Sequence, residues 1–411
     1  MIDLNQTVPK GFHNGTHRVR SPAETFAQVS RFMPLMGITR VANVTGLDTI
    51  GIPVVMVCRP NSRSVSVSQG KGLTLAAAKT SGLMESVEGY HAETITLPLK
   101  LASYEELRYT HDVVDVTRLP AIQGSAFHPN KRILWIEGYD LLSETNKWLP
   151  YEMVHTDYTV PPITGESCFP LTSNGLASGN HLLEAVAHGI NEVIERDATT
   201  LWGFLSSEAQ QQTRVDPATV DDPDCRYILD QLARADIGVL IWDTTSDVGL
   251  PSFQALIFEA SDQRFRELYG MLGMGTHTTR QIALMRALTE AVQTRLTVIS
   301  GSRDDIGREH YQHAQQVDLL NRIRAEARTQ SAGKSFRDVP SYEHGTFNAD
   351  IRSQLEHLRA VGIEEVVVID LTKPEFRIPV VRVVIPGLES IEELAEYLPG
   401  ARARQRIEQQ R

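Results

Sequence analysis

The sequence predicts an α/β protein built from layers of strands and helices. Residues 53–58 and 238–243 are apolar and rich in β-branched side chains, which is typical of buried strands. Three longer segments, residues 73–91, 181–204 and 280–300, repeat their apolar residues at helical spacing. Strands that alternate with helices along a chain of 411 residues favour a layered α/β fold.

The remaining elements are predicted from local signals. Residues 22–32 should form a helix, because Ser21 can cap it, Pro22 suits the first turn and Glu24 lies three residues after the cap. Residues 133–137 and 148–155 should be antiparallel strands, whereas the charged residues 302–345 should be partly mobile. Further strands are expected at 41–47, 252–259, 365–370 and 379–385, and further helices at 227–235, at 351–361 and in the C-terminal tail.

Composition limits the class of protein. The length predicts one unit of closely packed subdomains, divided at about residues 1–160, 161–300 and 301–411. The formal net charge is 40 − 51 = −11, which argues against nucleic acid as a partner. Three cysteines lie far apart without zinc-ligand spacing. With neither an apolar signal core nor a membrane-spanning run, we expect a cytoplasmic protein that does not contact a membrane.

The three long helices share one polar pattern. Residues at positions i, i+4 and i+7 line one edge of an α-helix, since successive residues turn by about 100°. The first helix places Ser81, Glu85 and Glu88 at this spacing. The second places His188, Glu192 and Glu195 there, and the third Arg286, Glu290 and Gln293.

Carboxylates stacked along a helix repel one another unless a cation lies between them. On the second helix Glu184 joins this stripe, and Asn180 lies just before it. A polar stripe on one helix alone is commonly a solvated face, but lysines are almost absent from these stripes. The simplest cation is Mg²⁺, which prefers oxygen ligands and usually binds together with phosphates.

A glycine-containing segment precedes each of these helices, at residues 70–72, 178–180 and 273–277. Such turns can leave backbone N–H groups free near a helix N-terminus, where anions bind. The shared layout indicates an internal repeat that places three helices around one pocket, although the spacing itself is common on amphipathic helices. The sequence contains neither a Walker A motif nor a dinucleotide fingerprint, so any nucleotide site must be of another kind.

Over residues 10–400 the chain resembles the YcaO superfamily. The matching segments are SQGKGLTLAAAKTSGLMESVE (68–88), TSNGLASGNHLLEAVAHGINEVIERDA (172–198) and GMGTHTTRQIALMRALTEAVQTR (273–295). They contain S-x-x-x-E-x-x-E, E-x-x-E-R-D-A and R-A-L-T-E-A-x-Q-x-R in that order, and KGFHNGTHR (10–18) resembles the family's N-terminal element. The resemblance implies a YcaO-type ATP-binding α/β fold, usually homodimeric. It also implies an enzyme that uses ATP and Mg²⁺ to phosphorylate the oxygen of a peptide backbone amide.

The resemblance also implies roles for residues of this chain. Arg196 and Arg286 match phosphate-contacting arginines and, with Glu195, are the expected catalytic residues. Cofactor-binding residues are expected at Ser81 and Asn180, and weaker candidates are Lys10, Thr16, Arg18 and Lys71. His188 could bind or merely pack, whereas Glu290 and Gln293 could support the ligands. The matched Mg²⁺-holding acids are Glu85, Glu88, Glu184, Glu192 and Glu195.

The reaction is expected to be thioamidation of a precursor peptide or protein. Azoline-forming members of the family typically end in a proline-rich tail, which PGARARQRIEQQR lacks. The chain resembles stand-alone members that act with TfuA-type partners, for which the implied product is a thioamide with sulfur delivered by the partner. Two alternatives stay open: an azoline-forming cyclodehydratase, and a non-catalytic accessory protein for modification of a ribosomal protein.

Overall fold

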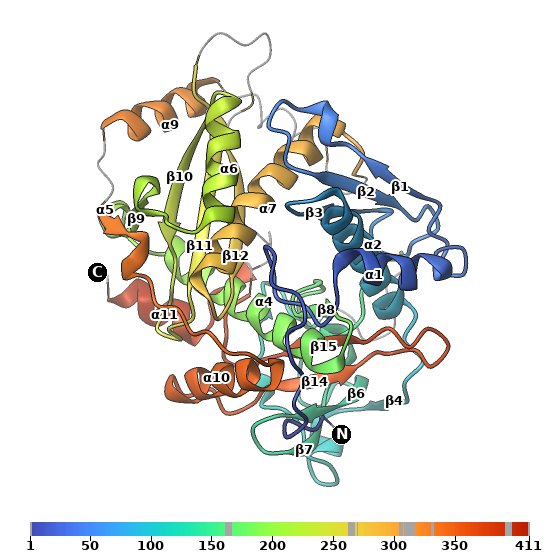
Figure 1. Ribbon diagram of the computed structural model, residues 1–411. Helices are drawn as coiled ribbons and strands as arrows, with labels where there is room; N and C mark the ends of the chain where they lie inside the picture. Colours follow the sequence, from blue (N-terminus) through green and yellow to red (C-terminus); the bar gives the residue numbers. More distant parts are fainter. Residues whose placement is uncertain are drawn as a thin grey trace.

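Three sheets, antiparallel except for the pair β9–β13, and the helices packed on them form the fold in the computed structural model (Figure 1). The structure describes residues 2–160, 167–261, 268, 270–303, 307, 317–329, 333–390 and 397–409. One sheet has the order β1 (Arg40–Asn43), β2 (Val54–Cys58) and β3 (Val67–Lys71). A second has the order β12 (Met271–Thr276), β11 (Ser252–Glu259), β10 (Ile237–Asp243), β9 (Arg214–Asp216) and β13 (Lys334–Ser335).

The third sheet joins distant parts of the chain. Its order is β4 (Leu99–Ala102), β6 (Ile133–Asp140), β14 (Val367–Asp370), β15 (Val380–Val384) and β8 (Leu176–Ser178), and β7 (Thr145–Pro150) pairs with β6. These strands come from all three segments expected from the sequence, so the segments share one sheet. A small ladder joins β16 (Tyr397–Leu398) to β5 (Ala121–Ile122).

Three long helices lie at the centre of the molecule: α2 (Leu75–Glu93), α4 (Leu182–Gly203) and α7 (Arg280–Ser300). Each follows a strand, β3, β8 or β12, after a connection of three residues, at 72–74, 179–181 and 277–279. Each polar triplet therefore begins at the seventh residue of its helix. This repeated strand–helix unit is the internal repeat that the sequence indicated, and it explains why equivalent side chains converge.

Three of the glycines before these helices do not lie in turns as the sequence predicted, whereas Gly72 and Gly179 do lie in the connections before α2 and α4. Gly70 lies within β3, and Gly273 and Gly275 lie within β12. A Cβ atom on Gly70 would lie 2.0 Å from the carbonyl oxygen of Ala78, and one on Gly275 would lie 2.1 Å from that of Ala283. These glycines therefore allow α2 to pack directly on β3 and α7 to pack directly on β12.

The smaller helices surround this centre. Their bounds are α1 (Pro22–Val29), α3 (Tyr104–Leu107), α5 (Ser207–Gln212), α6 (Pro223–Arg234), α9 (Val317–Thr329), α10 (Phe347–Ala360) and α11 (Ala401–Glu408). The expected capping box of α1 is present between Ser21 and Glu24. Helix α9 was missed, because its stretch was interpreted as charged and partly mobile, although Leu320 and Ile323 are buried one helical turn apart.

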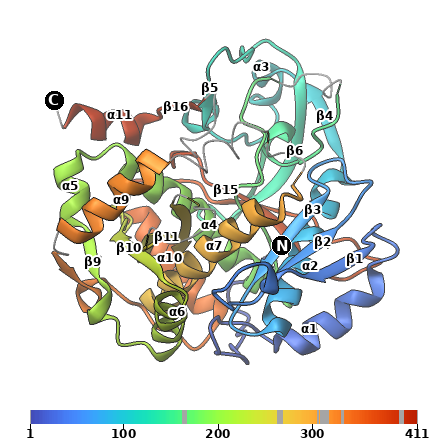
Figure 2. The ribbon, with the colours of Figure 1, turned by 90° about the horizontal axis from the view of Figure 1, so that it is seen from above.

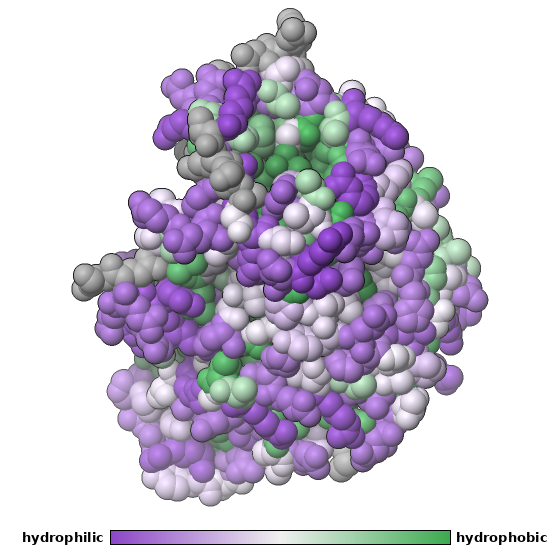
Figure 3. Space-filling view, turned by 60° about the vertical axis from the view of Figure 1, so that its left-hand side comes forward, coloured by the Kyte–Doolittle hydropathy of each residue, from purple (hydrophilic) through white to green (hydrophobic). Residues whose placement is uncertain are grey.

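Seen from above, the N-terminal segment lies against α2 and α7 (Figure 2). Gly15, with φ of +69°, brings this segment close to Leu73 and Met285. Hydrophilic residues dominate the face in Figure 3, where apolar residues form separate groups. Within the described residues, no helix has the length and apolar character that crossing a membrane requires.

We expect Gly275→Ala to destabilise the protein. The added methyl group would meet backbone atoms of α7 at 2.1–2.7 Å, and such overpacking costs about 1–3 kcal/mol. Urea unfolding measures the change. Gly46→Ala is the control, because nothing lies within 4 Å of its Cβ position. Equal stability of both variants would contradict the packing role of Gly275.

Candidate functional site

Two cavities meet between the three central helices. The first, of about 220 Å³, lies between the N-terminal segment, α2, α4 and α7. Its walls include Thr16, Arg18, Lys71, Ser81, Glu85, Glu88, Asn180, Glu184, His188 and Arg286. The second, of about 420 Å³, includes Lys71, Glu85, Glu88, Glu192, Glu195, Arg196, Arg286 and Glu290 in its walls.

Four of the expected residues belong to both cavities. Lys71, Glu85, Glu88 and Arg286 form the boundary between them. Ser81, Asn180 and the N-terminal residues lie only on the first side, whereas Glu195 and Arg196 lie only on the second. The structure thus brings together nearly all residues singled out from the sequence, from three helices and the N-terminal segment.

The carboxylates are held by neighbouring donors rather than by solvent. Ser178 donates to Glu88 at 2.6 Å, and the N–H of Gly175 donates to Glu192 at 3.3 Å. Buried Glu184 accepts from the N–H of Val19 at 2.8 Å and from Asn180 at 3.3 Å. These contacts fix the carboxylate groups but leave oxygen atoms available to a ligand.

Burial strongly raises the pKa values of three of these acids. Burial raises the pKa of Glu88 to about 8, and Glu192 and Glu85 add to the shift against the hydrogen bond from Ser178. Burial likewise raises the pKa of Glu85 and of Glu192 to about 7. Ionising all three acids together therefore requires a cation.

The acids fit Mg²⁺ that arrives with phosphate. Among the residues that the structure describes, no group of three or more His, Cys, Asp or Glu side chains converges into a metal site of its own. Mg²⁺ usually binds through one or two carboxylates and completes its shell with water and phosphate oxygens. Pairs such as Glu85 with Glu88 and Glu192 with Glu195 suit that mode of binding.

Two arginines supply positive charge beside these acids. Buried Glu195 lies 3.5 Å from Arg196 and 3.8 Å from Arg286, and it accepts from the N–H of Thr276 at 2.9 Å. The buried Nε of Arg286 has no hydrogen-bond partner in the described part of the chain. A half-buried guanidinium with a buried, unused Nε donor at the boundary of two cavities suits an anionic ligand.

Lys71 and Glu290 form an ion pair of 2.6 Å at the same boundary. Burial would raise the pKa of Glu290, but the charges of Lys71, Arg196 and Arg286 and the hydrogen bond from Lys71 together outweigh it and lower the pKa to about 2. Glu290 also accepts from the N–H of Met274 at 3.3 Å. Glu290 thus fixes the lysine, as the expected supporting role requires.

The N-terminal segment contributes Thr16 and Arg18 to the first cavity, where Arg18 approaches Glu184 to 3.7 Å. Lys10 is not in either wall. Its ammonium group forms a buried ion pair of 2.7 Å with Asp350 on α10, which ties the segment to that helix. The position of Lys10 therefore does not support a direct contact with the nucleotide.

His188 lines the first cavity, and burial lowers its pKa well below 6.5.

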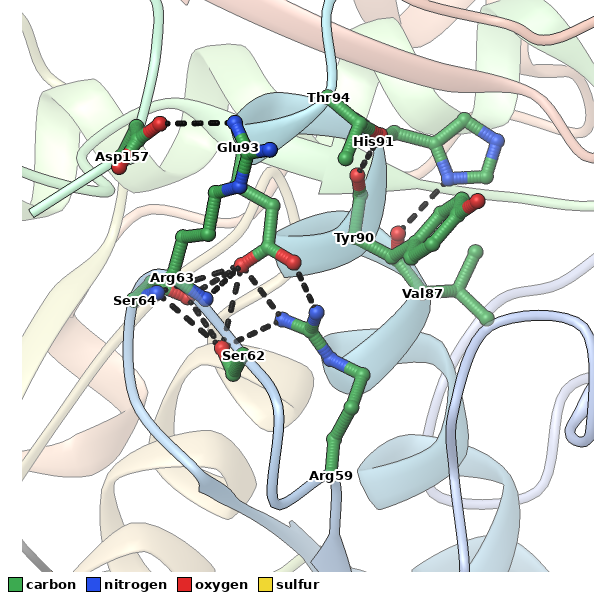
Figure 4. Close-up of polar contacts among 10 residues, drawn as sticks. All are labelled: Arg59, Ser62, Arg63, Ser64, Val87, Tyr90, His91, Glu93, Thr94 and Asp157. Carbon is green, nitrogen blue, oxygen red and sulfur yellow. Dashed lines mark hydrogen bonds and ion pairs between the residues drawn. The ribbon is translucent and has the colours of Figure 1, made fainter. Parts of the chain in front are cut away.

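Arg59 and Ser64 line the second cavity, and Glu93 at the end of α2 holds both in place (Figure 4). Glu93 pairs with Arg59 and accepts from the N–H of Arg63 at 2.9 Å and from Ser62 at 3.1 Å. Arg63 in turn pairs with Asp157 at 3.1 Å. This network holds the loop after β2 against the helix that carries Glu85 and Glu88.

Sequence reasoning missed several wall residues. Arg59 follows a predicted strand without a motif, and Arg303 begins the charged stretch that was expected to be partly mobile. Ser178 supports Glu88, but it was considered only as part of a turn.

Cys168 is buried, and burial raises the pKa of its thiol. A thiolate that could carry sulfur is therefore disfavoured at this position.

Known proteins match both the sequence and the fold. Residues 69–389 match the family model described as YcaO cyclodehydratase, ATP- and Mg²⁺-binding. An uncharacterized protein in the tfuA 3′ region of Rhizobium leguminosarum bv. trifolii is 36% identical over 382 residues, covering 90% of this chain and 88% of its own. An uncharacterized protein of Methanothermobacter thermautotrophicus is 32% identical over 372 residues, covering 90% and 94%.

Two solved structures share the fold. YcaO from Methanopyrus kandleri bound with AMPPCP and Mg²⁺ has a TM-score of 0.74 and 21% identity, covering 96% of this chain and 99% of its own. A heterocyclase in complex with substrate and cofactor has a TM-score of 0.77 and 23% identity, covering 97% of this chain. The present chain spans 58% of that heterocyclase chain.

The fold and the acid-lined site define an ATP- and Mg²⁺-binding class of α/β protein. The chain belongs to the YcaO family. This membership confirms the resemblance seen in the sequence, and the expected cofactors, ATP and Mg²⁺, are those in the family's description. The roles of individual site residues stay predictions.

We expect Glu88→Gln to flatten the pH dependence of stability in protein free of Mg²⁺ and nucleotide. The pKa of Glu88 rises from 4.5 to about 8, so between these values the folded protein binds the proton more tightly than the unfolded chain. The free energy of unfolding therefore falls as pH rises through this window, and the amide removes that contribution.

Urea unfolding at pH 5 and pH 8.5 would measure this effect. The matched control is Glu137→Gln, which changes an exposed glutamate on β6. If Glu88→Gln and wild type lost the same free energy between the two pH values, the burial-driven shift of Glu88 would be wrong.

Proposed function

We propose that this protein uses ATP to phosphorylate the oxygen of a peptide backbone amide, and that the product is a thioamide. The observation that carries the proposal is the boundary formed by Lys71, Glu85, Glu88 and Arg286. It allows the triphosphate to reach from the first cavity toward an amide in the second. Phosphoryl transfer requires positioned reactants and nearby positive charge, and this arrangement provides both.

The proposed roles follow from position. The N-terminal segment, Ser81 and Asn180 hold the nucleotide, while the carboxylates of α2 and α4 hold Mg²⁺ against its phosphates. Arg196 and Arg286, oriented by Glu195, stabilise the charge of the phosphoryl group during transfer. These side chains come from the three central helices, from the connection before α4 and from the N-terminal segment.

The proposed sulfur chemistry requires an external nucleophile. Hydrosulfide adds to the amide carbon, and the amide oxygen accepts the γ-phosphoryl group of ATP. The carbon–oxygen bond then breaks, inorganic phosphate leaves, and loss of the S–H proton completes the carbon–sulfur double bond. The position of a similar gene beside tfuA supports a TfuA-like sulfur-delivery partner. A homodimer is proposed from the family resemblance alone.

Cyclodehydration to an azoline is the second candidate, and the family model's description favours it. The two reactions share amide activation and differ in the nucleophile. The accessory role for ribosomal protein modification is less favoured, because the acids and arginines of the site are all present and face the cavities.

We expect Arg286→Ala to lower ATP turnover by at least about 100-fold, because it removes a preorganised cation from the transferring phosphate. Phosphate release measures turnover, and circular dichroism and thermal unfolding check the fold. Arg234→Ala, which changes an exposed arginine at the end of α6, should retain wild-type turnover. A folded Arg286→Ala protein with wild-type turnover would defeat the assignment.

Mass spectrometry separates the two reactions. The enzyme is co-expressed with a TfuA-like protein and with a candidate precursor peptide. We expect the peptide to gain the mass difference between sulfur and oxygen. Loss of one water would favour the azoline alternative, and an unchanged peptide in the presence of active ATP turnover would contradict both.

A further inference from the structure

The catalytic end of α4 is anchored from its opposite side by the C-terminal helix. Asp197 directly follows Glu195 and Arg196, but it is fully buried and lines neither of the two cavities. At about 100° per residue, Asp197 projects about 200° away from Glu195. Its contacts can therefore act on the helix without touching a bound nucleotide or amide.

The contacts of Asp197 converge on α11. Arg402 donates to its two oxygens from Nε at 2.9 Å and from Nη2 at 3.1 Å, and the N–H of Glu389 donates to it at 2.9 Å. One turn further along α4, Thr200 donates to the carbonyl oxygen of Ser390 at 2.7 Å. Two planar groups joined by two parallel bonds fix orientation as well as distance.

Helix α11 is itself held firmly. The carboxylate of Glu389 accepts from the N–H of Gly400 at 2.8 Å, from the N–H of Ala403 at 2.9 Å and from Tyr397 at 2.6 Å. A carboxylate at a helix N-terminus satisfies free N–H groups and the helix dipole. Arg402 is thus presented to Asp197 from a fixed helix start.

Arg402 also reaches the five-stranded sheet. Its guanidinium pairs with Asp247 in the loop after β10. On the cavity side of α4, the N–H of Thr276 in β12 donates to Glu195. The helix is therefore joined to this sheet at two places, once through Glu195 and once through Arg402.

We propose that Arg402 is a positioning residue, which acts through Asp197 to hold Glu195 and Arg196 in the second cavity. The inference rests on the proposed function, because that function assigns these two residues to phosphoryl transfer. Removing Arg402 leaves a buried carboxylate without its cation, and the end of α4 shifts to relieve it. Nucleotide contacts at Arg18, Asn180 and Glu184 lie at the other end of the site and stay in place.

The test compares Arg402→Gln, Arg402→Lys and Asp197→Asn with Arg404→Gln, an exposed position on the same helix. Initial rates of phosphate release are measured over a series of MgATP concentrations, well below the melting temperature of each variant. We expect Arg402→Gln to lower kcat by about tenfold or more while KM for MgATP changes by less than about twofold. Lysine should recover part of the loss, and Arg404→Gln should match wild type.

A double variant, Asp197→Asn with Arg402→Gln, shows whether the two residues act through one another. We expect it to be no slower than the slower single variant, since the same contact is lost only once. Wild-type kcat in folded Arg402→Gln would overturn the proposal. So would losses that add fully in the double variant, or a rise in KM that matches the fall in kcat.

Glu195→Gln, assayed in parallel, separates this inference from the proposed function. Loss of turnover in Glu195→Gln with normal turnover in Arg402→Gln would overturn the positioning role alone. Wild-type turnover in Glu195→Gln would remove the role of Glu195 in phosphoryl transfer, and the positioning role would fall with it.

Discussion

Burial of the acids that α2 and α4 place around the two cavities is the constraint on which this site depends. Burial raises the pKa values of Glu85, Glu88 and Glu192 into the neutral range, so each acid is held partly protonated until a cation arrives. A fold that places such groups together loses stability that hydrophobic side chains would have provided. In the proposed role, Mg²⁺ bound with a phosphate-bearing ligand would favour the ionised acids and offset the cost of burying their charge.

The repeated strand–helix unit makes the arrangement possible. Glycines in β3 and β12 let the backbones of strand and helix touch, which brings α2 and α7 deep into the centre. A connection of three residues then sets the rotation of each helix, so position seven and its neighbours face inward in all three. The apolar sides of α4 and α7 pack into separate clusters behind the site.

The sequence predicted what local periodicity can encode. The three long helices, the cap of α1 and the polar triplets follow from residue spacing, and the family motifs identified the wall residues Arg196 and Arg286. Contacts between distant segments were not predictable, because no local pattern marks them. The pairing of Lys10 with Asp350 and that of Arg402 with Asp197 each join residues more than 200 positions apart. Gly70, Gly273 and Gly275 were interpreted as turn residues, because a turn and a close strand–helix contact both favour glycine.

The central claim is that nucleotide and Mg²⁺ bind at the boundary of the two cavities. A crystal structure of the protein with AMPPCP and Mn²⁺ in place of Mg²⁺ tests it most directly, because Mn²⁺ gives an anomalous signal. We expect anomalous peaks between the γ-phosphate analogue and carboxylates of both α2 and α4, with Arg286 at the same phosphate. Nucleotide bound elsewhere, or Mn²⁺ absent from these carboxylates while AMPPCP is present, would contradict it.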